Sequence, residues 1–188
     1  MVIVKSRTYT ETSWCVSHIG YPTSQTLYLD STTETLTRDR ITARSASTFD
    51  VGSHFEVNED GYTYAAYCWA EIPGLQKFGI YTGNGTSTNF VHLGFRPTFV
   101  MVKRTDSANG WFIGDSARNP YNQLSANLRA DTGNSESTIG TVPQDFVSNG
   151  FVLKDASGAH NASGGTYIYA AFAEAPTFNL YGGQANAR

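Results

Sequence analysis

The sequence predicts an all-β protein, an antiparallel β-sandwich or jelly-roll-like fold made of two tandem related copies with the first truncated. Aromatic residues are 13% of the 188-residue chain and glycines number 18. With many Thr, Ser and Asn, this composition suits short strands and tight turns. Apolar residues alternate with polar ones or come in short bursts, and no segment shows helical periodicity. A third observation, internal repetition, predicts the two copies.

The expected strands follow in order along the chain. Those of the first part are the apolar bursts 2–4, 14–16, 27–29, 55–57 and 62–69. Pro73-Gly74 interrupts the pattern, and strands at 78–81 and 90–93 follow. The segments 77–83 and 90–95 are expected to form a hairpin closed by the turn 83–88, because Asn-Gly favours such turns. The remaining strands are 99–102, 111–113, 151–153 and 167–172. One short helical turn could lie within 117–128, but we do not predict it.

Several motifs of the first part recur about 100 residues further along, in the same order. The matches are Val2-Ile3-Val4-Lys5 with Val100-Met101-Val102-Lys103, Trp14 with Trp111, Leu29 with Leu128, Asn58-Glu59-Asp60-Gly61 with Asn161-Ala162-Ser163-Gly164, Thr63-Tyr64 with Thr166-Tyr167, and Trp69-Ala70-Glu71 with Phe172-Ala173-Glu174. They predict a truncated first copy at 1–72, a complete second copy with its opening hairpin at 73–176, and a C-terminal tail at 177–188.

The first copy lacks an opening hairpin, since the chain enters directly at the Val2 strand. A sheet without that hairpin exposes a strand edge, which invites association unless it is covered. Either the middle hairpin serves both copies or a neighbouring subunit supplies the missing strands. The second possibility makes an obligate homo-oligomer the expected state.

Charge and composition exclude several classes of protein. A net charge of -3 argues against nucleic acid as a partner, because phosphate binding needs a dense basic surface. No apolar run approaches the ~20 residues of a membrane span, so no membrane insertion is expected. Two cysteines cannot form a disulfide framework or a four-cysteine zinc site. Cys15 and Cys68 are expected to be free and buried, with a disulfide between them as the less favoured alternative.

No catalytic residue, metal site or cofactor is predicted. The four histidines, at 18, 54, 92 and 160, lack metal-ligand spacing and are expected to be solvated or locally bonded. No nucleophile elbow, phosphate loop or dinucleotide motif is present. The carboxylates of Glu56 with Glu71, or of Asp115 with Asp131, could form a glycosidase pair, although acids on strands usually face solvent. The 58–61 segment could bind calcium, but a plain turn is the favoured interpretation.

The aromatic residues are the better candidates for binding. Core packing is expected of Trp14, Trp69, Trp111 and Phe172, which lie at or near repeated positions. The tyrosines beside turns are expected at the surface, where an aromatic face can stack on a sugar ring or a flat partner. The candidate binding residues are therefore Tyr21, Tyr28, Tyr81 and Tyr121.

One pattern resembles a known family. It comprises Lys77–Gly85, Gly94–Pro97, Val102–Thr105, Ser148–Phe151 and Asn161–Glu174. It resembles a β-rich module repeated in tail-fibre and other virion structural proteins of tailed, cyanophage-like bacteriophages. The resemblance is strong over 77–176 and weaker over 2–71, and it brings no catalytic residues with it.

The resemblance implies a protein exposed on the phage particle and made in the host cytoplasm. The first expectation is a tail fibre or tail appendage module contributing to host-surface attachment. The alternative is a capsid-decorating (cement or head-fibre) protein, and a glycan-depolymerising tailspike-type enzyme comes third. The expected partners are the protein itself, other virion proteins and, as a further candidate, host surface glycan.

Overall fold

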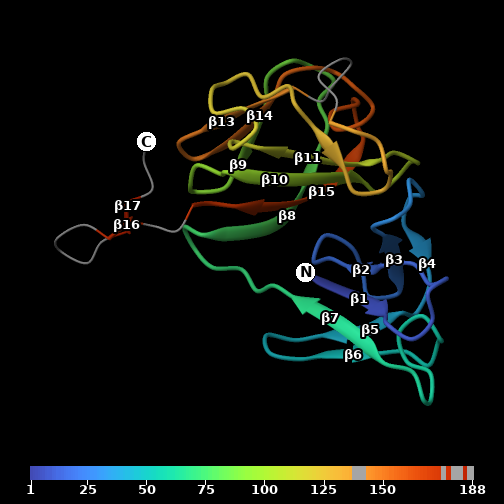
Figure 1. The fold of residues 1–188 in the computed structure, drawn as a ribbon. Coiled ribbons are helices and arrows are strands. Elements are labelled where there is room, and N and C mark those ends of the chain that lie inside the picture. Colours follow the sequence, from blue (N-terminus) through green and yellow to red (C-terminus); the bar gives the residue numbers. More distant parts are fainter. Residues whose placement is uncertain (137–142, 175–176, 179–183, 186–188) are drawn as a thin grey trace.

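The computed structural model describes residues 1–136, 143–174, 177–178 and 184–185. These residues form 17 strands and no helix, which confirms the predicted all-β class (Figure 1). The strands are β1 (Val2–Ser6), β2 (Cys15–Ser17), β3 (Gln25–Tyr28), β4 (Leu36–Thr37), β5 (Ile41–Arg44), β6 (Phe49–Val51), β7 (Tyr64–Cys68), β8 (Gln76–Thr82), β9 (Asn89–His92), β10 (Phe99–Arg104), β11 (Trp111–Asp115), β12 (Leu128–Arg129), β13 (Gln144–Val147), β14 (Gly150–Leu153), β15 (Thr166–Phe172), β16 (Thr177–Phe178) and β17 (Gln184–Ala185).

Two five-stranded antiparallel sheets form the centre of the molecule. The first sheet has the strand order β4-β3-β2-β1-β7, and the second has the order β12-β11-β10-β15-β8. A three-stranded sheet, β13-β14-β9, and the pairs β5-β6 and β16-β17 complete the described strands. Within this part of the chain no helix is long and apolar enough to cross a membrane.

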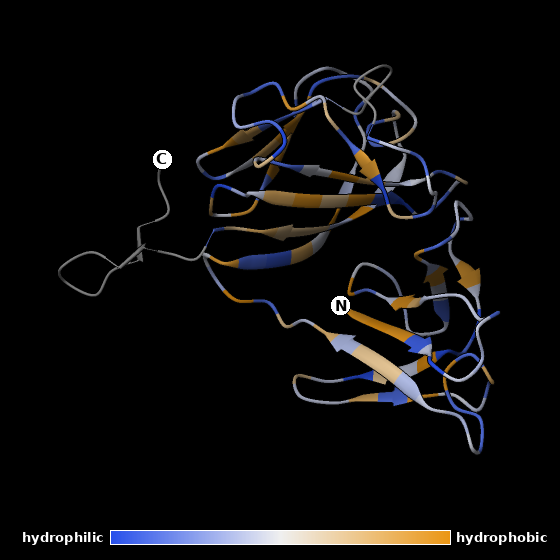
Figure 2. Cartoon of the chain, viewed as in Figure 1, coloured by the Kyte–Doolittle hydropathy of each residue, from blue (hydrophilic) through white to orange (hydrophobic). Residues whose placement is uncertain are grey.

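Three apolar clusters hold these sheets in layers. Figure 2 shows where hydrophobic residues lie along the strands of these layers. One cluster, with Val102, Phe151 and Tyr169, fills the space between the second five-stranded sheet and the three-stranded sheet. Another joins the two five-stranded sheets through residues such as Ile3 and Met101. A third packs the first sheet against β5 and β6. The chain therefore folds as two β-sandwiches, the first with β1–β7 and the second with β8–β15, placed back to back.

The two five-stranded sheets correspond strand by strand. Val4 of β1 lies opposite Cys15 and Ala66, and Val102 of β10 lies opposite Phe112 and Tyr169. Strands β1, β2, β3 and β7 thus have β10, β11, β12 and β15 as counterparts. Residues at matching register positions, and the loop residues Asn58 and Asn161 matched by the sequence repeat, are counterparts. The origin of both halves in one duplicated module stays a prediction.

Hydrogen bonds outside the β-ladders also match between the two sandwiches. The Trp14 backbone N–H donates to Asp30 Oδ1 at 3.2 Å, and the Trp111 N–H donates to Asp131 Oδ1 at 2.7 Å. The matching of Leu29 with Leu128 was wrong by two residues, because Leu128 lies opposite Ile113 as Leu27 lies opposite Val16.

The expected hairpin of 77–83 with 90–95 was also wrong. Strand β8 pairs with β15, whereas β9 pairs with β14 of the three-stranded sheet. The 83–88 segment therefore connects the two layers of the second sandwich. Tyr81 of β8 and Val91 of β9 both pack into the apolar cluster between these layers. Neither strand pairs with the first sheet, so the middle segment does not cover the edge of β7.

The 55–57 segment, expected as a strand, forms a turn. Its backbone hydrogen bonds are local, because the N–H groups of Val57 and Asn58 both donate to His54 O at 2.9 Å. Glu56 and Val57 are buried, which accounts for the apolar pattern without a ladder.

Candidate assembly site

Strand β7 borders the first sheet. It pairs with β1 on one side, and no strand in the described part of the chain pairs with its other side. Its counterpart β15 lies between β10 and β8. The backbone bonds of Trp69 N–H to Met1 O and of Arg7 N–H to Thr63 O fix the alternation of the ladder. Tyr64, Ala66 and Cys68 therefore direct their backbone N–H and C=O groups outward, toward the unpaired side.

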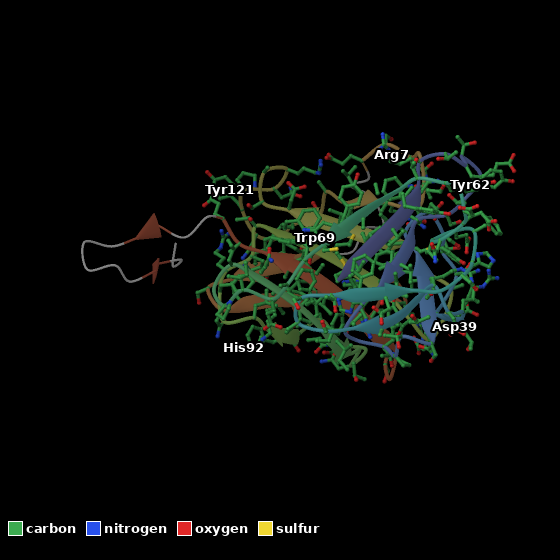
Figure 3. The ribbon with its side chains drawn as sticks, turned by 90° about the horizontal axis from the view of Figure 1, so that it is seen from below. Arg7, Asp39, Tyr62, Trp69, His92 and Tyr121 are labelled. Carbon is green, nitrogen blue, oxygen red and sulfur yellow. The ribbon has the colours of Figure 1, made fainter. Side chains whose placement is uncertain are left out.

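The side chains of β7 are exposed where those of β15 are buried. Tyr67 is 47% exposed, and Ala66 and Cys68 are exposed too. The counterparts of Tyr67 and Cys68, Ala170 and Ala171, are 2% and 0% exposed. Figure 3 shows this side of the molecule, with β7 running from the end near Tyr62 toward Trp69. An edge that combines outward backbone groups with apolar side chains is suited to strand addition.

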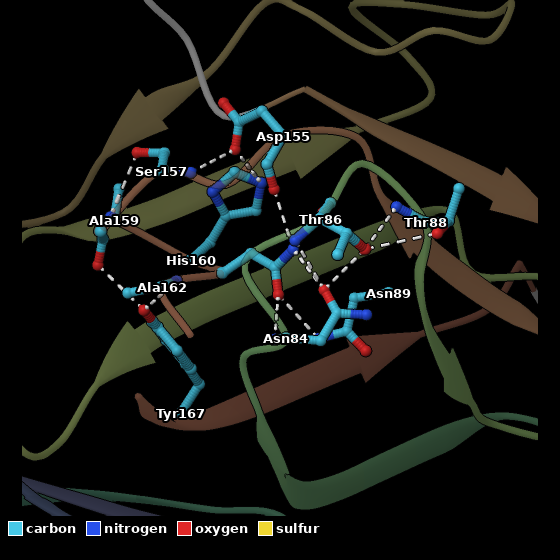
Figure 4. Close-up of polar contacts among 12 residues, drawn as sticks. Asn84, Thr86, Thr88, Asn89, Asp155, Ser157, Ala159, His160, Ala162 and Tyr167 are labelled. Atoms are coloured by element: carbon cyan, nitrogen blue, oxygen red, sulfur yellow. Dashed lines mark hydrogen bonds and ion pairs between the residues drawn. The ribbon is translucent and has the colours of Figure 1, made fainter. Parts of the chain in front are cut away.

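In the second sandwich, the side chain of Asn161 holds the crossing between β8 and β9 by hydrogen bonds to residues such as Asn84 and Asn89, which Figure 4 labels. Its Nδ2 donates to Asn84 Oδ1 at 3.1 Å, to Thr86 O and to Asp155 O at 2.8 Å. Its Oδ1 accepts from Asn84 N–H at 3.0 Å and from Asn89 Nδ2 at 2.7 Å. The side chain is fully buried, and all its hydrogen-bonding groups have partners on or near this crossing.

The first sandwich carries the same loop without the crossing. Asn58, the counterpart of Asn161, is exposed. The loop geometry is retained, since Gly61 and Gly164 both have a φ of 75°, a conformation that favours glycine. Tyr64 Oη accepts from Glu59 N–H at 2.9 Å and donates to Phe55 O at 2.7 Å. Tyr167 makes the matching bonds to Ala162 N–H and Gly158 O. The loop of Asn58 is thus preformed but holds no partner strand among the described residues.

A second contact of the β8 end is aromatic. Tyr81 stacks on Tyr167, with ring centroids 5.1 Å apart and an interplanar angle of 9°. Its hydroxyl donates to His160 O at 2.6 Å, and burial raises the pKa of Tyr81 well above its ordinary value. Tyr64, the counterpart of Tyr167, is only half-buried.

Exposed aromatic residues surround the Asn58 end of β7. The ring of Tyr9 lies 5.9 Å from that of Phe55 and 6.1 Å from that of Tyr62. These three residues are 38%, 40% and 37% exposed. They form an exposed aromatic cluster near the start of β7.

A cavity of about 660 Å³ lies at the other end of β7. Its lining includes Met1, Ile19, Cys68, Trp69 and Phe78, so it lies where the strand leaves the first sheet. Ile19 is 67% exposed. Both ends of β7 therefore carry apolar groups open to a partner.

Two of the predicted binding tyrosines lie in the core rather than at the surface. Tyr21 and Tyr28 are each 7% exposed, and their hydroxyls donate to Val16 O at 2.7 Å and to Glu56 Oε2 at 2.9 Å. Each ring thus packs inward while its hydroxyl finds a buried acceptor. Tyr81 is partly buried in the second core, and Tyr121 is 83% exposed. The structure brings no two of these four tyrosines together as a pair, and binding by Tyr121 stays a prediction.

The predicted core aromatics are confirmed. Trp111 is 1% exposed and donates its Nε1–H to Tyr28 O at 2.8 Å, which joins the two sandwiches. Trp14, Trp69 and Phe172 pack at the border of the same cluster.

Two histidines, His18 and His160, are buried rather than solvated, and His18 is locally bonded, which was the other expected state. His18 Nδ1 accepts from Gly20 N–H at 3.0 Å, so its Nε2–H donates to Tyr169 O at 3.0 Å. Burial lowers the pKa of His18 to about 3. Burial also lowers the pKa of His160 to about 4, although its Nε2 lies 3.4 Å from Asp155 Oδ1. Both rings are neutral at pH 7 and serve packing.

Both cysteines are free thiols, as the favoured interpretation expected. Cys15 is buried, and burial raises its pKa to about 12. Cys68 is exposed, so its predicted burial was wrong. The reason is the unpaired edge of β7, since its counterpart Ala171 is covered by β8.

The acidic residues considered for catalysis have separate structural contacts. Glu56 pairs with Arg40 in a buried ion pair, while Glu71 lines the cavity. Asp115 pairs with Arg118 at 2.9 Å, and Asp131 with Arg129 at 2.5 Å. Among the described residues no three His, Cys, Asp or Glu side chains gather to hold a metal ion.

Comparison with known proteins finds one family. The model of a domain of unknown function, DUF7483, matches residues 1–176. No curated protein and no solved structure matches the chain. The matched range spans both sandwiches, so the family unit comprises the open sheet as well as the closed one.

Proposed function

The chain belongs to the DUF7483 family, and from that premise we propose that it is a structural subunit of a phage particle, a tail fibre or tail appendage module that assembles with itself. The observation that carries the proposal is the unpaired edge of β7. Strand addition at this edge joins subunits without a separate docking domain. The assembled array then presents its outer surface to the host.

The physical argument starts from the backbone. Three outward N–H groups, those of Tyr64, Ala66 and Cys68, lie on an edge of uncharged side chains that is exposed from Ala66 to Cys68. Proteins usually protect such an edge with charged residues, proline, a bulge or a covering segment. β7 has the sequence Tyr-Ala-Ala-Tyr-Cys, with no charge and no proline. A partner strand would satisfy its outward backbone groups.

The placement on a particle is supported by the resemblance of residues 77–176 to virion modules. In an oligomer, weak contacts of single subunits with a host surface add through multivalency. Tyr121, at 83% exposure, is the candidate contact residue of each subunit.

Light scattering coupled to size-exclusion chromatography tests the assembly. The wild-type chain is expected to form an oligomer, and Ala66→Pro is expected to shift it to monomer, because proline removes an outward N–H without touching the β1 ladder. Ala66→Val, which keeps that N–H, is the matched control. A wild-type chain that stays monomeric at every concentration contradicts the proposal.

Host attachment is tested separately by binding of the purified oligomer to host cells. Specific binding supports the attachment role. A flat result leaves a purely structural role in the particle, and the copy number per particle then separates decoration of the capsid, with hundreds of copies, from the tail. Release of reducing sugar from host polysaccharide would instead indicate the depolymerase.

A further inference from the structure

The C-terminal segment resembles the sequence of β8. Phe78-Gly79-Ile80-Tyr81-Thr82-Gly83 and Phe178-Asn179-Leu180-Tyr181-Gly182-Gly183 share the Phe, the Tyr and the final Gly, with Leu in place of Ile. Both segments follow an Ala-Glu-x-Pro motif, at 70–73 and at 173–176. The chain therefore contains two segments with the pattern of a closing strand. Within the described residues only one of them, β8, is paired with a five-stranded sheet.

The register of β8 on β15 defines how the second segment would lie on β7. Lys77, Gly79 and Tyr81 lie opposite Ala171, Tyr169 and Tyr167. The counterparts on β7 are Cys68, Ala66 and Tyr64. In the same register, Thr177, Asn179 and Tyr181 would lie opposite these three residues. They would then meet the three outward backbone groups of β7.

Side-chain size matches this register and distinguishes the two edges. A Cβ at Gly79 would lie 2.6 Å from the hydroxyl oxygen of Tyr169, so the strand on β15 requires glycine there. β7 carries Ala66 in place of Tyr169. The small side chain leaves room for Asn179 in place of Gly79. The C-terminal segment therefore fits β7, while β8 fits β15.

The loop contacts extend the match. Tyr181 would stack on the half-buried ring of Tyr64, as Tyr81 stacks on Tyr167. The segment after Gly183 would pass the exposed amide of Asn58, as the crossing after Gly83 passes Asn161.

We propose that the C-terminal segment, residues 177–186, of one chain adds to β7 of a second copy of the same chain as its missing edge strand. The proposal rests on the proposed function, self-assembly at β7, and names the occupant of that edge. The donor and acceptor surfaces differ, so the interface is heterologous and builds a head-to-tail ring or fibre.

The described part of the segment lies away from β7. Thr177 and Phe178 pair with Ala185 and Gln184 of the same chain, and β16 and β17 lie beyond the end of the second sheet in Figure 1. Addition to a neighbour exchanges this two-residue ladder for the longer ladder of β7. The gain in backbone pairing and aromatic stacking favours the exchange.

Cys68 provides a native probe for the register. Directly opposed residues of an antiparallel pair have Cα atoms about 4.5–5.5 Å apart, within the range of a disulfide. The full-length Thr177→Cys variant, oxidised with glutathione disulfide, is expected to form disulfides between Cys68 of one chain and the introduced thiol at position 177 of the next. They are seen as a ladder on a non-reducing gel and assigned by peptide mass spectrometry. The matched controls are Thr177→Cys with Cys68→Ala, and Asn179→Cys, which places the new thiol opposite Ala66.

Four outcomes are distinguishable. A ladder given by Thr177→Cys and by neither control supports the proposal, and a ten-fold weaker association of the Tyr181→Asp variant would strengthen it. A disulfide between Cys68 and position 177 within single chains overturns it, because the tail then closes its own sheet. An oligomer with no such disulfide also overturns it, while leaving assembly at β7 intact. A chain that is monomeric overturns the inference and the proposed function together.

Discussion

In the second sandwich β15 lies between β10 and β8, whereas in the first sandwich β7 has a partner on one side only within the described residues. Apart from β4, which has no counterpart in the second sheet, the two sheets otherwise share strand order, register and a set of loop hydrogen bonds. Asn161 is buried and fully bonded, but Asn58 is exposed. The framework of each sandwich is therefore independent of its closing strand.

This difference separates the contacts that shape one sandwich from the strand that closes its sheet. The hydrogen bonds of the Trp14 and Trp111 N–H groups to aspartates, and those of the Tyr64 and Tyr167 hydroxyls to their loops, lie within single sandwiches. Closure depends on one further strand, which the second sandwich takes from its own chain. A sheet that is complete except for this strand can be closed by a neighbour, so assembly needs little rearrangement of the acceptor.

Acidification is expected to give the largest effect, and it tests the buried groups of the second sandwich and of the junction. The pKa values of His18 and His160 are lowered to about 3 and about 4, below the ordinary 6.5. The unfolded chain therefore binds more protons below pH 6.5, and stability falls as the pH falls. Between pH 7 and pH 5 each histidine should remove about 2 kcal/mol of unfolding free energy.

Urea unfolding at the two pH values measures this loss. The His18→Gln variant should retain about half of the pH dependence. An unfolding free energy that does not change between pH 7 and pH 5 would show that the rings are not held neutral.

Replacing the counterparts Asn161 and Asn58 tests the difference between the closed and the open loop. Asn161→Ala should lower the unfolding free energy by about 3 kcal/mol, because several buried groups lose their partner. Asn58→Ala should change it by less than about 0.5 kcal/mol at dilutions where the chain is monomeric. Chemical denaturation of both variants gives the two values, and equal losses would contradict the difference between the loops.

The position of Gly79 tests the fit of β8 on β15. Gly79→Ala should cost about 2 kcal/mol, since the new methyl group meets the buried ring of Tyr169. Asn179→Ala should leave the unfolding free energy of the monomer unchanged. Thermal unfolding of the two variants measures both effects, and a neutral Gly79→Ala would mean that β8 does not require a glycine.

The smallest expected difference in unfolding free energy is between variants of Tyr21 and Tyr121. Tyr21→Phe should cost about 1 kcal/mol, because the hydroxyl donates to Val16 O in the core. Tyr121→Phe should have no measurable effect on urea unfolding. A loss at Tyr121 equal to that at Tyr21 would place Tyr121 in a packed interface.

Some of these features could be predicted from the sequence and others could not. Alternating apolar bursts predicted the strands around Val4, Val102 and Phe151, since such strands have one buried face. Strands such as β5 and β13 lack an apolar burst and were missed. Gly83-Asn84-Gly85 indicated a turn, but the same residues serve a hairpin or a crossing between layers. The unpaired edge was expected from the missing strands, whereas the burial of Tyr21 and Tyr28 depends on long-range packing that local sequence does not encode.

Hydrogen–deuterium exchange of β7 and β15 at low and high protein concentration tests the central claim most directly. The account predicts that the backbone amides of Tyr64, Ala66 and Cys68 exchange fast at high dilution and slow down as the chain assembles, while the β15 amides stay protected throughout. Protection of the β7 amides equal to that of β15 at every concentration would contradict an open edge that a neighbouring chain closes.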